Sequence, residues 1–209
     1  HYDWFESWNP VRGPVCEFLQ EAKDEGLIRY TGLGGTTAYE LAYIIEHGDF
    51  DVVLTAFNYS LLWREAANAV IPAAKAKGMG IVSGSPLQQG WFSRRYDEVV
   101  RDDPPPWLSP ARREQILRLY ALLDETEMPL PELALRFVLS NEDFDTVLMG
   151  ARCVEEVEMN VASAEAGALP DDVMAELDEI GAMVPFRPCE EPFGCALAWS
   201  ERRGTGPLR

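Results

Sequence analysis

The segment VIPAAKAKGMGIVSGSPL, Val70 to Leu87, contains the pattern that decides the fold. Apolar residues recur at helical spacing up to Gly78, and a short apolar run, Met79 to Ser83, follows without polar alternation. Such a run is typical of a strand buried on both faces of a parallel sheet, and the preceding helix is the crossover that a parallel sheet needs. The segment therefore predicts one helix–strand step of an α/β protein.

The same step recurs on both sides of this segment. The predicted strands are Ile28 to Leu33, Asp51 to Thr55, Met79 to Ser83 and Thr146 to Met149. An amphipathic helical stretch precedes each strand, and Pro131 opens the last of these stretches. Two further helices follow, one through Val157 and Val161 and one through Val173 and Leu177. This alternation predicts a parallel sheet covered by helices.

The composition excludes several classes of function. The 209 residues form one domain by default, and 35 acidic against 18 basic residues give a net charge of −17. This charge repels nucleic acid and anionic membrane surfaces. No stretch approaches the ~20 apolar residues that span a bilayer, and no signal peptide opens the chain, so we expect a soluble cytoplasmic protein. The widely spaced cysteines favour free thiols over a zinc site: Cys16, Cys153, Cys189 and Cys195.

Length and glycine pattern leave two α/β architectures open. A closed eight-stranded barrel usually takes ~250 residues, whereas an open doubly wound sheet can be built from fewer. The segment Gly32 to Gly35 has no third glycine at the offset that a dinucleotide-binding fingerprint requires. Arg101 to Pro110, with three consecutive prolines, predicts a surface loop after the third strand, either functional or a plain insertion.

Three segments together resemble the aldo-keto reductase family in order and separation. They are GLIRYTGLGGTTAYEL (Gly26 to Leu41), KGMGIVSGSPLQQGWFS (Lys77 to Ser93) and DTVLMGARCVEEVEMN (Asp145 to Asn160). The resemblance implies a (β/α)8 TIM barrel, of which this chain holds the last strands and helices. The implied organisation is a partial barrel over residues 1–184, the nicotinamide-binding half, and a C-terminal tail over residues 185–209.

The resemblance also implies a cofactor site at the ends of the strands. Ser85, Leu87 and Gly90 would line the cofactor pyrophosphate, because small residues and a helix start suit an anion. The residues implied for the adenosine end are Gly150, Arg152, Glu156 and Asn160. A carboxylate at Glu156 repels a 2′-phosphate and accepts hydrogen bonds from a 2′-hydroxyl, whereas Arg152 favours the phosphate. The cofactor is therefore NAD or NADP, with a slight preference for NAD.

Candidate substrate residues follow the second strand and lie in the proline-rich loop. The segment FDVVLTAFNYSLL, Phe50 to Leu62, resembles the family branch that contains sugar dehydrogenases, which implies substrate contacts for Asn58 and Tyr59. The alternative for this pair is a structural corner. Trp107 is a candidate apolar wall of the substrate site or a packing residue.

The family's proton-transfer residues, a tyrosine, a lysine and an aspartate, lie on early strands that no segment of this chain resembles. His1, followed by Tyr2 and Asp3, resembles the stretch with the family's catalytic histidine, and an accidental terminal histidine is the alternative. His47 precedes a helix-ending glycine, which indicates a structural role.

The function expected from these observations is NAD(P)-dependent hydride transfer between nicotinamide and the carbonyl or alcohol group of an aldehyde, ketone or sugar. The alternatives are a non-catalytic nicotinamide-binding subunit or truncated reductase without the Asp/Tyr/Lys residues, and an isomerase or phosphate-ligand binder on the same barrel type. The expected partners are the small-molecule substrate and either the missing N-terminal half or further copies of the chain, with no nucleic acid and no membrane.

Overall fold

The computed structural model describes residues 4–187 and divides into two compact units, which we describe separately. The first unit consists of His1–Tyr59, Glu65–Gly84 and Glu142–Leu148, and the second of Ser60–Arg64, Ser85–Asn141 and Met149–Arg209. None of the helices within residues 4–187 combines the length and apolar character of a bilayer-crossing segment.

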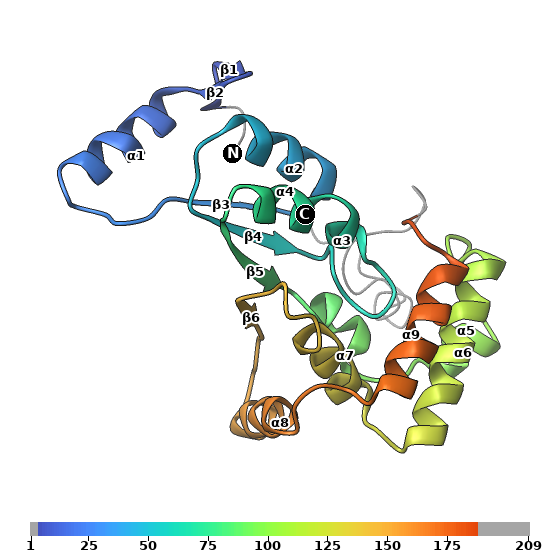
Figure 1. Ribbon diagram of the computed structural model, residues 1–209. Helices are drawn as coiled ribbons and strands as arrows, with labels where there is room; N and C mark the ends of the chain where they lie inside the picture. The colour runs from blue at the N-terminus through green and yellow to red at the C-terminus, as the bar shows by residue number, and fades with distance from the viewer. Residues whose placement is uncertain (1–3, 188–209) are drawn as a thin grey trace. The chain divides into compact units, whose positions relative to one another are not determined.

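The first unit contains a parallel sheet. Its elements are β1 (Ser7–Trp8), β2 (Val11–Arg12), α1 (Pro14–Asp24), β3 (Gly32–Gly35), α2 (Ala38–His47), β4 (Val52–Ala56), α3 (Glu65–Asn68), α4 (Val70–Ala76), β5 (Gly80–Gly84) and β6 (Thr146–Leu148). Strands β3, β4, β5 and β6 pair in this order, all parallel (Figure 1). Because the order never reverses, the sheet has no doubly wound switch point and is wound in one direction, as in α/β barrels.

The two faces of this sheet differ in burial. Leu33, Val53 and Ile81 form one row across β3, β4 and β5, and they are 6%, 0% and 1% exposed. Helices α2 and α4 pack against each other and lie on one side of the sheet (Figure 1). In the next row, on the opposite face, Leu54 and Val82 are only half-buried. The helix-covered face is therefore the core of the first unit.

Aspartates bind main-chain groups where the strands begin. Asp51 Oδ2 accepts hydrogen bonds from the Thr31 main-chain N–H at 2.6 Å and from the Lys23 ammonium at 2.9 Å. The Thr31 N–H bond, followed by the Lys23 bond, lowers the pKa of Asp51 below its ordinary value. Asp145 Oδ2 similarly accepts the Ile81 N–H at 2.7 Å. These carboxylates connect neighbouring strands at their amino ends.

The second unit is helical. Its elements are the irregular 3-10 helix η2 (Gln88–Ser93), α5 (Asp97–Arg101), α6 (Pro110–Thr126), α7 (Leu130–Leu139), α8 (Val154–Glu165) and α9 (Asp171–Met183). Helix α6 packs against α9, and α7 packs against both α8 and η2. Ser109 begins α6 by accepting the Arg112 N–H on its hydroxyl at 3.2 Å, with Pro110 in the first turn. Helix α7 thus connects the two segments implied in cofactor binding.

The predicted helix–strand alternation is confirmed, but the sequence analysis predicted neither the β1–β2 pair nor the helices α3, α5 and α6. The first strand is Gly32–Gly35, whereas Ile28 to Leu33 was expected, because the chain from 28 to 31 forms a loop with Tyr30 exposed. Helix α6 was not predicted, because Arg112 and Gln115 lie on its fully buried face and obscure the apolar period. Most of the predicted tail lies outside the described residues.

Candidate functional site

The turn that follows β5 contains an unusual concentration of left-handed backbone. Among residues 4–187 five non-glycine residues have positive φ, and three of them are Ser85 at 59°, Gln88 at 50° and Gln89 at 54°. Gly90 continues the run at 93°. Each left-handed non-glycine residue costs about 1–2 kcal/mol. This turn is therefore a strained segment that its surroundings must stabilise.

Hydrogen bonds and buried rings stabilise the turn. Gln88 is fully buried and donates from Nε2 to Ser60 Oγ at 3.0 Å. The Ser93 hydroxyl donates to the Gly90 carbonyl at 2.6 Å. The Trp91 ring, 2% exposed, lies 4.8 Å from Trp63 in an edge-to-face contact. These contacts fix the main chain between Ser85 and Ser93.

The start of α8 carries the second implied group of cofactor residues. The Glu156 carboxylate accepts the Arg152 main-chain N–H at 2.7 Å and the Arg152 guanidinium at 2.6 Å. These two bonds lower the pKa of Glu156, the guanidinium bond contributing most. The guanidinium is 86% exposed, so it is available to a ligand from its open side. An internal carboxylate thus occupies the helix N-terminus that would otherwise attract an anion.

One observation at the start of α8 fits a phosphate-bearing dinucleotide. A Cβ built on Gly150 meets no atom within 4 Å, so the main chain before α8 is open to close approach. In the turn after β5, by contrast, the N–H groups of Gln88 and Gly90 donate hydrogen bonds to the Ser85 and Leu87 carbonyls, both at 2.9 Å. Asn160 lies one turn further along α8 than Glu156 and is half-buried.

The remaining predicted site residues lie elsewhere. Asn58 is 4% exposed and donates from Nδ2 to Thr55 Oγ1 at 3.0 Å. Tyr59 is 8% exposed and packs edge-on against Phe144 at 4.9 Å. Both belong to the first unit, whereas Trp107 belongs to the second and packs against Trp91 at 5.6 Å. His1 lies outside the described residues.

His47, expected to be structural, directs Nδ1 at the Tyr43 carbonyl at 2.8 Å and stacks on the Tyr43 ring. Cys16 and Cys153 are free thiols, whereas Cys189 and Cys195 lie outside the described residues.

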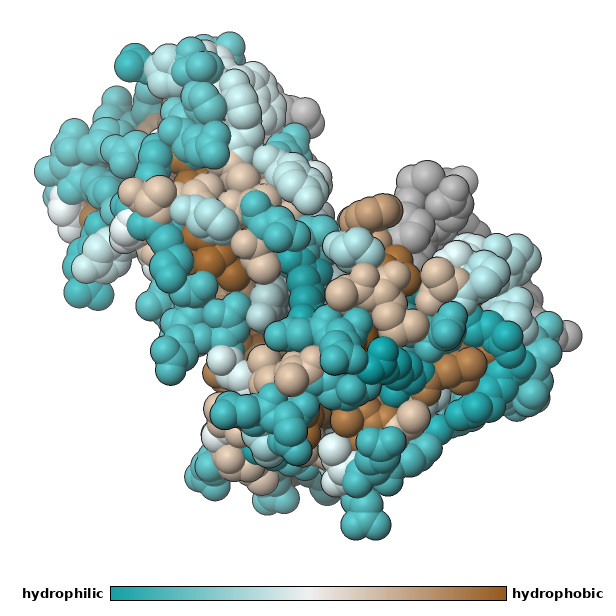
Figure 2. Space-filling model, turned by 45° about the vertical axis from the view of Figure 1, so that its right-hand side comes forward, coloured by the Kyte–Doolittle hydropathy of each residue, from teal (hydrophilic) through white to brown (hydrophobic). Residues whose placement is uncertain are grey.

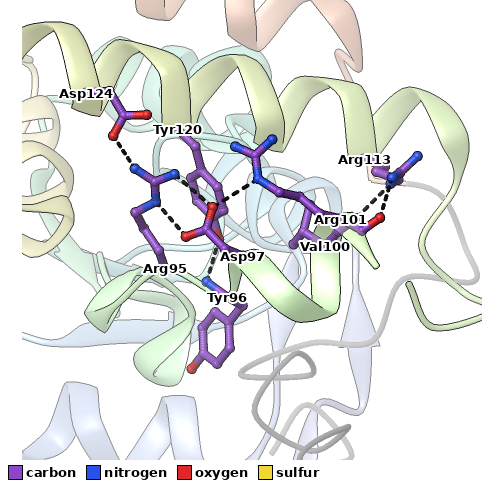
Figure 3. A network of polar contacts seen from close by, with 8 residues as sticks. All are labelled: Arg95, Tyr96, Asp97, Val100, Arg101, Arg113, Tyr120 and Asp124. Atoms are coloured by element: carbon purple, nitrogen blue, oxygen red, sulfur yellow. Dashed lines mark hydrogen bonds and ion pairs between the residues drawn. The ribbon is translucent and has the colours of Figure 1, made fainter. Parts of the chain in front are cut away.

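A polar network beside the strained turn was missed by the sequence analysis. Arg95 binds Asp97 and Asp124, and the guanidinium lies over the Tyr120 ring (Figure 3). The pairing of Arg95 with Asp124, 29 residues away, depends on α6, which the sequence analysis did not predict.

Comparison with known proteins identifies the relatives. A family model described as "Aldo/keto reductase family" matches residues 2–182. L-galactose dehydrogenase of Arabidopsis thaliana is 27% identical over 184 residues, 84% of this chain and 55% of that protein. The NADH-specific methylglyoxal reductase of Escherichia coli (strain K12) is 28% identical over 76% of this chain and 52% of that protein. D-threo-aldose 1-dehydrogenase of Pseudomonas sp is 27% identical over 77% and 49%.

A solved structure supports the same fold. The holo form of an aldo-keto reductase from Bacillus halodurans matches with a TM-score of 0.62 at 24% identity, over 86% of this chain and 60% of that one. The chain spans about half the length of the curated relatives it matches.

A parallel sheet wound in chain order, with helices between its strands, defines a class of α/β scaffolds. Within that class, the chain belongs to the aldo/keto reductase family. Its relatives bear the names of dehydrogenases and reductases of sugars and aldehydes.

Proposed function

We propose that this chain belongs to an oxidoreductase that transfers a hydride between a nicotinamide cofactor and the carbonyl or alcohol group of an aldehyde, ketone or sugar. The observation that carries the proposal is the left-handed turn from Ser85 to Gly90 in a chain of this family. Strain of this kind persists where a segment is preorganised for a ligand. The names of the relatives support the substrate class.

The cofactor, when bound, supplies or accepts the hydride. Ser85, Leu87 and Gly90 would line the pyrophosphate, as the family resemblance implies. The residues that would hold the adenosine end are Gly150, Arg152, Glu156 and Asn160. Helix α7 packs against both η2 and α8, so it holds these two groups within one unit.

The preference between NAD and NADP is proposed to depend on Glu156. Its carboxylate binds both the N–H and the guanidinium of Arg152, so it neutralises the cation that would otherwise attract a 2′-phosphate. This contact supports a slight preference for NAD. The name of the Escherichia coli relative, an NADH-specific reductase, is in keeping with it.

Proton transfer is the open chemical step. The family's proton-transfer tyrosine, lysine and aspartate have no counterpart in the three resembling segments, and His1 is the one candidate for the catalytic histidine. The alternative function is therefore a nicotinamide-binding chain without catalysis. Detectable turnover of an aldehyde with NADH would reject that alternative, whereas binding without turnover would support it.

The substrate contacts proposed for Asn58, Tyr59 and Trp107 remain part of this proposal, together with a small carbonyl or sugar as ligand and a location in the cytoplasm. Replacing Trp107 by Ala tests whether this residue contacts the substrate. A substrate contact predicts a changed KM with an unchanged dinucleotide affinity. A packing role predicts a lower stability, with KM and dinucleotide affinity affected alike.

We propose further that the sheet is half of a (β/α)8 barrel whose other half lies in a polypeptide segment beyond the described residues. The half-buried sheet face at Leu54 and Val82 supports this. In the second unit, helix α8 separately exposes three valines, since Val154, Val157 and Val161 are 67%, 49% and 52% exposed. Figure 2 shows hydrophobic residues at the surface among hydrophilic ones. Because each copy carries a charge of −17, a second copy is the poorer candidate for covering these faces.

Solution behaviour tests this half-barrel. The chain alone should bind an apolar dye or self-associate, and Val157→Lys should reduce both effects, whereas Glu158→Lys on the same helix should not. A monomeric chain without dye binding would contradict the proposal.

Titration with NADH and NADPH, followed by tryptophan fluorescence, tests the cofactor site. Trp91 lies in the turn and is a natural probe. Asn160→Ala should weaken binding by about tenfold through loss of a polar contact. The matched control is Asn68→Ala on the exposed face of α3, which should leave the affinity within about twofold. Absence of binding by the folded chain would reject the proposed function.

A further inference from the structure

The turn after β5 leads directly into a network of buried and charged side chains. Tyr96 follows η2 by three residues and is 4% exposed. Its main-chain N–H donates to the Tyr120 hydroxyl at 3.0 Å (Figure 3). Tyr120 is 2% exposed and lies in the middle of α6. The Tyr120 side chain of α6 therefore binds the main chain at Tyr96, just after the turn.

The Tyr96 side chain also contacts the turn. Its hydroxyl points to the Gly90 carbonyl at 3.4 Å, a long and weak contact. The same carbonyl accepts the Ser93 hydroxyl at 2.6 Å. Two hydroxyl groups from the exit of the turn thus converge on the peptide of Gly90, whose φ of 93° is the most extreme of the left-handed run.

Arg95 packs against the Tyr120 ring and fixes its position. The guanidinium lies 4.7 Å from the ring centroid and binds Asp97 through Nε at 2.9 Å and Nη2 at 2.8 Å. Its remaining Nη1 binds Asp124, one turn beyond Tyr120 on α6. Figure 3 shows this arrangement, in which Arg101 also contacts Asp97. All of these residues belong to the second unit.

We propose that Tyr120 is a positioning residue for the turn from Ser85 to Ser93, acting through Tyr96. The hydroxyl of Tyr120 supplies the acceptor that a buried N–H needs, and Arg95 fixes the ring that carries it. Burial raises the pKa of Tyr120 above its ordinary value, which further favours the neutral hydroxyl. The consequence for dinucleotide binding rests on the proposed function, whereas the effect on the turn does not.

Amide hydrogen exchange of the full chain without ligand is the first measurement. Tyr120→Phe keeps the ring and removes the hydroxyl, so exchange in residues 88–96 should rise by about fivefold or more, while exchange in β4 stays unchanged. Tyr96→Phe should produce a smaller rise confined to residues 88–93. The control is Tyr39→Phe, whose ring is 64% exposed on α2 and should leave exchange unchanged.

Dinucleotide affinity is the second measurement. Tyr120→Phe should weaken NADH binding by about tenfold, with the exchange of β4 unchanged. Arg95→Lys, which keeps the charge, should retain more affinity than Arg95→Met, because it still pairs with Asp97. Exchange in residues 88–96 within about twofold of the unaltered chain would overturn the inference. If exchange rises as expected but the unaltered chain binds no dinucleotide, the positioning role stands and the proposed function fails.

Discussion

The Arg64 guanidinium lies directly against the main chain of Gly181, so a Cβ at that glycine would come within 2.8 Å of Arg64 Cζ. Arg64 donates to the Leu177 carbonyl at 2.6 Å and to Asp178 at 2.5 Å. Its other face covers the Phe137 ring at 4.5 Å. One side chain thus joins α7 and α9, and the absence of a side chain at 181 makes room for it.

Gly181→Ala should destabilise the chain because the new methyl group collides with this guanidinium and displaces it from its bonds to Leu177 and Asp178. The collision costs about 1–3 kcal/mol, and the better helix propensity of Ala returns about 1 kcal/mol. We expect a net loss of about 1 kcal/mol in the free energy of unfolding, measured by urea denaturation.

A double variant separates these two effects. In an Arg64→Ala background the collision is gone, so Gly181→Ala should become stabilising by about 0.5–1 kcal/mol. If Gly181→Ala changed the free energy of unfolding with the same sign in both backgrounds, the steric explanation would be contradicted.

Asp51→Asn should reduce the dependence of stability on pH. The folded-state pKa of Asp51 is lowered, so its contribution is present above the unfolded-state pKa and is lost as pH falls through the folded-state value. The unfolding free energy of the unaltered chain should therefore fall more steeply below about pH 4 than that of the variant. The exposed Asp49→Asn is the control and should keep the original profile.

Glu156→Gln should raise the affinity for NADPH relative to NADH by about fivefold, because the Arg152 charge is no longer neutralised by a carboxylate while the amide oxygen still reaches the Arg152 N–H. The ratio of the two dissociation constants measures this, and high salt should reduce the change. Glu158→Gln on the exposed side of α8 provides the comparison. If both variants changed the ratio of the two dissociation constants equally, the cofactor preference would depend only on the net charge of the chain.

Arg136→Met should destabilise the second unit by about 1–3 kcal/mol. Arg136 donates to the Gly167 and Ala168 carbonyls, both at 3.0 Å, and pairs with Glu132 within α7. The substitution leaves two loop carbonyls between α8 and α9 without this donor. Thermal unfolding should show the loss, and an unchanged midpoint would contradict it. Arg12→Met at an exposed position is the control.

The strands near Val53 and Ile81 could be predicted from local sequence, since uninterrupted apolar runs after glycine-ended helices have few other solutions. The strand at Gly32–Gly35 was displaced from its predicted position, because its glycines carry little hydrophobic signal and only pairing with β4 defines it. The helix α6 stayed hidden because a buried Arg112 breaks the apolar period that a single sequence displays.

The candidate cofactor residues were implied by the family resemblance of two short segments, near Ser85 and Gly150, which is visible in the local sequence. The contacts around them were decided only by the tertiary structure. The pairing of Tyr96 with Tyr120, and of Arg95 with Asp124, joins residues more than 20 positions apart. Local patterns determine which segments form helices and strands, because those depend on neighbouring residues. Which polar side chains meet depends on the packing of whole elements, a property that no short stretch of this chain encodes.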